Sequence, residues 1–150
     1  MADISMELMK KLREKTGSGM ALCKEAITAA NGNLDDAITY IRKKDSAQAA
    51  KKAERSTGQG VTLSRISADG QTGALIEVAC ETDFVAKNDL FQKYCTELLD
   101  ALLAAKSAAG ADQLKLADGK SAAERLTAAI ATTGENMKFR RAAILKAPAG

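Results

Sequence analysis

The sequence predicts an α+β protein: a small three-helix bundle, then a small antiparallel sheet of about three strands with helices on one face. Three observations predict this class. Apolar residues recur at helical spacing before position 42. The pattern changes to strand-like alternation from Val61 onwards. Residues 90–103 then carry a wide apolar stripe, which is typical of a helix that covers a sheet.

The first helix is expected at residues 3–16, where Asp3 or Ser5 can cap its start. The glycines of residues 16–19 break it, because glycine readily takes a positive φ. A second helix follows at about residues 20–30.

Asn31 and Gly32 end the second helix in the manner of a left-handed cap. Asn33 can then cap a third helix. Its apolar positions are Leu34, Ala37, Ile38 and Ile41. Three helices of this length form a compact bundle of the ubiquitin-associated-like kind.

Residues 42–55 are rich in Ala and Lys and weakly patterned, so we expect a helical or partly flexible linker. The glycine-containing segment 56–60 is the expected boundary. The sequence therefore predicts two domains, a bundle with a basic linker at 1–55 and an α+β core subdomain at 56–150.

The sheet is expected to begin with a hairpin, in which strands at 61–66 and 74–80 flank a turn-rich loop at 68–73. Alternation at 137–145 predicts a third strand.

Two helices are expected between the second and third strands. Asn88 or Asp89 starts the long one. Ser121 and Glu124 form a capping-box pattern that opens the other, which runs to about residue 132.

The amino-acid composition excludes most kinds of catalytic site. The chain has no histidine, so no Ser-His-Asp triad, Cys-His pair or histidine metal site can form. Cys23, Cys80 and Cys95 form no Cys-x-x-Cys pair, which favours reduced thiols in a cytoplasmic protein. We therefore expect no catalytic residue, no bound metal and no cofactor.

The formal net charge of +3 is unevenly distributed. Residues 1–55 hold 11 Lys/Arg and 8 Asp/Glu, and the remainder is balanced. This favours an acidic protein surface or nucleic acid as a neighbour, although a solvated helix face gives the same pattern. Residues 1–7 contain no base, so we expect no targeting segment there, and no apolar run is long enough for a membrane span.

The most informative segment is residues 77–87, EVACETDFVAK, in which a strand leads directly into an acidic-aromatic-basic turn. Phe84 is one of five aromatic residues in the chain. A large ring beside the carboxylate of Asp83 can anchor a partner. The alternative is that Phe84 is an ordinary core residue that seals the loop.

Three segments in this chain resemble signatures of bacterial elongation factor Ts. They are LREKTGSGMALCKEAI at 12–27, TDFV at 82–85, and GENMKFRR at 134–141. They occur in the family's order and at family-like spacing. The resemblance covers the amino-terminal module and the first half of the family's core.

The resemblance implies a guanine-nucleotide exchange factor that acts by binding and is not an enzyme. Its implied partner is elongation factor Tu with GDP, and direct nucleic-acid binding is not expected. The turn would intrude near the partner's magnesium site. Its residues are Thr82, Asp83, Phe84 and Val85, with Phe84 as the wedge and Asp83 as the group that disturbs magnesium coordination. The bundle would dock on the nucleotide-binding domain through Leu12, Arg13, Gly19 and Met20.

Other functions remain open at the level of sequence. Family members usually continue into a second core half, so a truncated form that binds elongation factor Tu without full exchange activity is one alternative. An RNA-binding translation accessory protein that uses the basic segment 42–55 is another, and a ubiquitin-associated-like adaptor is a third. Ala79 also stands where the family commonly has Asn.

Overall fold

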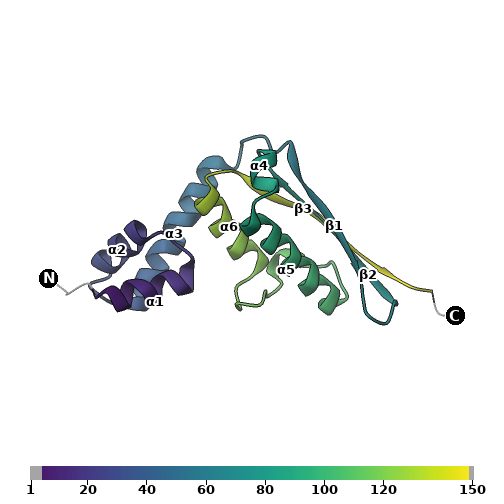
Figure 1. Ribbon diagram of the computed structural model, residues 1–150, viewed down its shortest axis with the longest axis horizontal. Helices are drawn as coiled ribbons and strands as arrows, with labels where there is room; N and C mark the ends of the chain where they lie inside the picture. The colour runs from purple at the N-terminus through teal and green to yellow at the C-terminus, as the bar shows by residue number, and fades with distance from the viewer. Residues whose placement is uncertain (1–4, 149–150) are drawn as a thin grey trace. The chain divides into compact units, whose positions relative to one another are not determined.

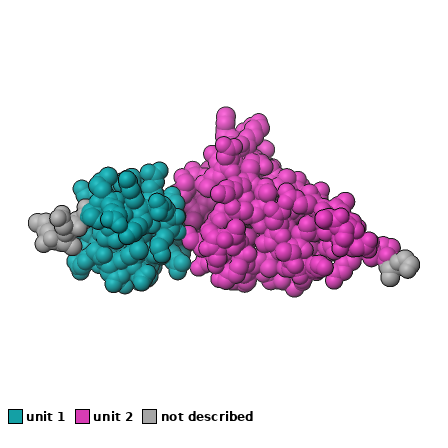
Figure 2. Space-filling view, turned by 60° about the horizontal axis from the view of Figure 1, so that its bottom comes forward, with its two compact units in different colours: residues 1–51 teal, residues 52–150 magenta. Residues whose placement is uncertain are grey.

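The structure is a computed structural model that describes residues 5–148. It is α+β, as the sequence predicts (Figure 1). The chain divides into two compact units, Met1–Lys51 and Lys52–Gly150 (Figure 2). In the described part of the chain, no helix is both long and apolar enough to cross a membrane.

The first unit is built from α1 (Met6–Thr16), α2 (Met20–Ala29) and most of α3 (Leu34–Lys52). The helices meet through a buried apolar cluster of Leu12, Cys23, Ala26, Ile27, Ala37 and Ile41. The bundle that the periodicity predicts is therefore present in the described residues.

The ends of these helices are capped by local hydrogen bonds. The Ser5 hydroxyl accepts from the Leu8 N–H at 3.1 Å, whereas Asp3, the other predicted cap, lies outside the described residues. Gly17 ends α1 at φ 72°, a conformation that glycine adopts without strain. The Asn33 Oδ1 accepts from the N–H groups of residues 35 and 36, which caps α3.

The segment expected as a linker is mostly helix, because α3 continues without interruption to Lys52. The expected boundary segment lies inside the second unit. There Gly60 already pairs with Ala79 in the sheet.

The second unit contains an antiparallel sheet in the order β1 (Gln59–Ile66), β2 (Thr72–Cys80) and β3 (Met137–Lys146). The helical elements are α4 (Asp83–Ala86), α5 (Asp89–Ala105), the 3₁₀ turn η1 (Ala111–Gln113) and α6 (Ala122–Thr133). Figure 1 shows α5 and α6 on the same side of the sheet. Their caps, Asn88 for α5 and the Ser121–Glu124 capping box for α6, are those that the sequence predicts.

The core of this unit lies between β2 and α5. Alternate β2 residues, Ala74, Ile76, Val78 and Cys80, are buried. The stripe on α5 is buried too, through Phe91, Tyr94, Cys95, Leu98, Leu99 and Leu102. The buried face of β2 therefore packs against the apolar stripe of α5. This packing fixes the position of the end of β2, after which α4 begins.

Pairing between β2 and β3 contains one irregularity. Glu77 lies opposite Arg141 and Val78 lies opposite Phe139, so Arg140 has no partner in the register. Such a bulge disturbs strict alternation. The two arginines consequently make separate contacts: Arg141 pairs with Glu77 at 2.5 Å, and Arg140 donates to the Thr57 carbonyl at 3.1 Å.

Candidate functional site

The segment that the sequence singles out forms a single helical turn, α4, directly after β2. Thr82 is its N-cap, and its hydroxyl accepts from the Val85 N–H at 3.4 Å. The Thr82 carbonyl accepts from the Ala86 N–H at 3.2 Å. A helix of four residues has too few internal hydrogen bonds to be stable by itself, so its surroundings must hold it.

Phe84 points into solvent, with 83% of its surface exposed. The next two residues, Val85 and Ala86, are buried and attach the turn to the rest of the unit. The interpretation of Phe84 as a core residue is therefore wrong. Single exposed apolar side chains are common on protein surfaces, so the weight of this observation comes from the anchored turn that carries the ring.

Asp83 lies beside the ring at the start of α4 and is exposed. Its carboxylate pairs with the Lys87 ammonium at 3.0 Å, one helical turn later. Both partners of this pair are on the surface, where such pairs contribute little to stability. The Asp83 carboxylate thus remains accessible to a partner.

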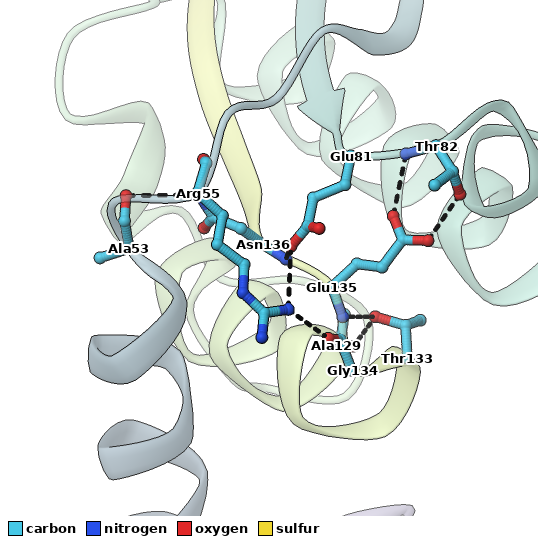
Figure 3. A network of polar contacts seen from close by, with 9 residues as sticks. All are labelled: Ala53, Arg55, Glu81, Thr82, Ala129, Thr133, Gly134, Glu135 and Asn136. Atoms are coloured by element: carbon cyan, nitrogen blue, oxygen red, sulfur yellow. Dashed lines mark hydrogen bonds and ion pairs between the residues drawn. The ribbon is translucent and has the colours of Figure 1, made fainter.

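Glu135 holds the N-cap of α4 from the loop that follows α6 (Figure 3). One carboxylate oxygen accepts from the Thr82 N–H at 3.0 Å. The other accepts from the Thr82 hydroxyl at 2.5 Å. The sequence does not predict Glu135 as a site residue, although it lies in the third signature segment. Its partner Thr82 is 53 positions away in the sequence, so no local pattern connects the two residues.

A second cross-link lies next to the first. The Asn136 N–H donates to the Glu81 carboxylate at 2.6 Å, and its buried side-chain amide donates to the carbonyls of Ala53 and Arg55 at 3.3 and 2.8 Å. The Arg55 guanidinium reaches Glu81 at 3.4 Å and the Gly134 carbonyl at 3.3 Å. The Asn136 N–H, with the guanidinium, lowers the pKa of Glu81 below its ordinary value.

The three thiols are buried and unpaired. Burial raises the pKa of each, and that of Cys95 reaches about 12. At neutral pH they are therefore protonated, which is the unreactive form. Among the described residues, no three His, Cys, Asp or Glu side chains gather in a way that could hold a metal ion.

The bundle residues implied by the resemblance fall into two groups. Leu12 is fully buried in the core of the first unit, so it supports the fold and offers no surface. Arg13 and Gly19 are exposed and Met20 is half-buried. Gly19 is the N-cap of α2, and Met20 is the first residue of that helix.

Comparisons with known proteins agree with the sequence signatures. The family model described as Elongation factor TS matches residues 81–150, which include α4 and Glu135. Elongation factor Ts of Rickettsia rickettsii (strain Sheila Smith) is 43% identical over 148 residues, which cover 99% of this chain and 47% of that protein. Elongation factor Ts of Arthrospira platensis is 42% identical over 149 residues, which cover 98% of this chain and 60% of that protein.

The similarity thus extends over nearly all of this chain, including both units. The chain spans about half the length of the relatives it matches. The resemblance seen in the sequence signatures is therefore confirmed, and this chain corresponds to a part of the proteins of the elongation factor Ts family.

Proposed function

We propose that this chain binds elongation factor Tu and promotes GDP release by disturbing its magnesium and phosphate site. The observation that carries the proposal is the exposed Phe84 ring on an anchored helical turn. Exposed aromatic rings on rigid supports are typical centres of protein interfaces. The family resemblance supplies the identity of the partner.

The proposed mechanism has no covalent step. Phe84 enters the partner as a wedge, and Asp83 disturbs the coordination of magnesium. Magnesium bridges the phosphates of a bound nucleotide, so its displacement weakens nucleotide binding. The coupling is reciprocal: the factor by which this chain weakens GDP binding is the factor by which GDP weakens binding of this chain.

The bundle provides the second part of the proposed interface, through Arg13, Gly19 and Met20. The basic segment, by contrast, is partly neutralised within its own unit. Lys44 pairs with Glu25 and lies over the ring of Tyr40 at 5.5 Å. This favours a protein partner over RNA.

The test is stopped-flow release of a fluorescent GDP analogue from elongation factor Tu at two magnesium concentrations. Phe84→Ala should fold normally and slow stimulated release about 30-fold, the effect of losing an anchor worth about 2 kcal/mol. Asp83→Asn should show a smaller defect that shrinks at low magnesium, because its proposed task is then already done.

Ile66→Ala is the matched control. Ile66 is also strongly exposed, but it pairs with Gly73 at the opposite end of the hairpin from α4. Equal stimulation by Phe84→Ala and the parent chain would refute the wedge. A pull-down with elongation factor Tu, with and without excess GDP and magnesium, measures binding separately from GDP release. Binding without stimulated release indicates a form that binds without full exchange activity. Absence of both binding and stimulated release refutes the proposed function.

A further inference from the structure

We propose that Glu135 is a positioning residue for exchange: its carboxylate fixes the N-cap of α4 and thereby holds Phe84 in the orientation that a partner meets. This inference rests on the proposed function and assigns a further residue to it. Glu135 acts through Thr82 and need not touch the partner.

The argument begins with the weakness of α4. Its four residues cannot hold a helical conformation alone. The burial of Val85 and Ala86 fixes one side of the turn, which leaves its starting end dependent on Thr82. The Thr82 hydroxyl has to point at the Val85 N–H for the cap to form.

Glu135 supplies that orientation. Its two oxygens engage both donors of Thr82, so the hydroxyl proton goes to the carboxylate and a lone pair faces the Val85 N–H. Hydrogen bonds to an ionised acceptor are stronger than neutral ones. A single carboxylate therefore fixes both the backbone and the side chain of the cap residue.

The position of Glu135 is itself well determined. It follows Gly134, which ends α6 at φ 77°, and the Glu135 N–H donates to the Thr133 hydroxyl at 3.4 Å. The adjacent Asn136 is nearly fully buried and cross-linked to Glu81 (Figure 3). The segment that follows α6 is thus joined to the segment that follows β2 by two neighbouring contacts. Glu135 contacts Thr82, and Asn136 contacts Glu81.

The first experiment is partner-independent. Hydrogen exchange of the free protein should show faster exchange of the Val85 and Ala86 amides in Glu135→Ala, with α5 amides unchanged. Asp112→Ala, which removes an exposed carboxylate outside this network in the same unit, is the charge-matched control. Unchanged exchange at Val85 and Ala86 overturns the proposal, whether or not the chain stimulates GDP release.

The second experiment is a double-mutant cycle on stimulated GDP release. Glu135→Ala should lower stimulation about tenfold, the scale of one lost hydrogen bond to a charged group. Added to Phe84→Ala, it should cause less than about a twofold further loss, whereas independent sites give additive effects. Full additivity, or an unaltered rate in Glu135→Ala alone, overturns the proposal.

Thr82 variants provide a further check that separates positioning from folding. Thr82→Val removes the hydroxyl that Glu135 orients and should match Glu135→Ala, and the combination should be no worse than either. If Glu135→Ala fails to fold, Glu135→Gln keeps the size and one acceptor, and the same cycle applies to it. If the parent chain does not stimulate GDP release, the proposed function is refuted. The hydrogen-exchange measurement on the free protein still decides whether Glu135 holds α4.

Discussion

Phe84 is exposed because its two successors are buried. Consecutive residues of a helix are about 100° apart, so burying Val85 and Ala86 turns the preceding side chain away from the unit. Sequence periodicity cannot reveal this in a helix of one turn, since a pattern needs several turns to be read. The sequence alone is therefore compatible with Phe84 as a partner anchor and with Phe84 as a core residue. The burial of Val85 and Ala86 decides between the two.

Met20 offers a test of the proposed bundle surface. Met20→Asp should weaken binding to elongation factor Tu about tenfold or more, because a charge replaces an adaptable apolar contact. The helical circular dichroism should hardly change, since an acidic residue is favourable in the first turn of a helix.

Ala21→Asp is the control for this prediction. Ala21 is the exposed neighbour in the same turn, and the variant carries the same charge change. Loss of helicity in Met20→Asp alone would place Met20 in the core and remove it from the interface.

At the level of elements, Gly60 is a required glycine. Its φ is 150°, and a Cβ there would overlap the Val78 carbonyl oxygen and lie 2.7 Å from the Ala79 Cα. Gly60→Ala should lower the free energy of unfolding of the second unit by about 2 kcal/mol. Gly73→Ala, in the same sheet, meets only the Leu145 Cβ at 3.9 Å and should be far milder.

Urea unfolding in a Tyr40→Phe background measures this difference in the second unit. The chain has two tyrosines and no tryptophan, so Tyr94 then gives the only tyrosine signal. Equal midpoints for the two glycine variants would show that the strand shifts to accommodate a side chain at position 60.

Elements whose signals are local were predictable from the sequence. The capping box at Ser121, the cap at Asn33 and the hairpin each depend on a few neighbouring residues. The bulge that leaves Arg140 unpaired was not predictable, because register arises from pairing between distant strands. For the same reason, the sequence gives no indication that Glu135 meets Thr82.

For the molecule as a whole, stability should form a plateau between about pH 6 and 8. Hydrogen bonds, with a smaller part from ion pairing, lower the pKa of Glu25 and Glu81. Their contribution to stability is present above the ordinary carboxylate pKa and is lost as the pH falls through the lowered values. Burial raises the pKa of Cys95 to about 12 and also raises that of Tyr94. Their contribution is present below the ordinary values and is lost as the pH rises through the raised ones.

Urea midpoints at half-unit pH intervals measure this plateau. A midpoint that moves between pH 6 and 8 would contradict it, because the chain has no histidine and the resolved shifts all lie outside that range.

The absence of histidine also affects how the kinetics of nucleotide exchange are interpreted. Because histidine is absent, the α-amino group is the one group of this chain whose ordinary pKa lies between about 6 and 8. With the α-amino group acetylated, a pH dependence of nucleotide release in that range would report protonation events in the partner or in the nucleotide itself. The acetylated chain would then be a proton-silent probe of the GTPase on which we propose that it acts.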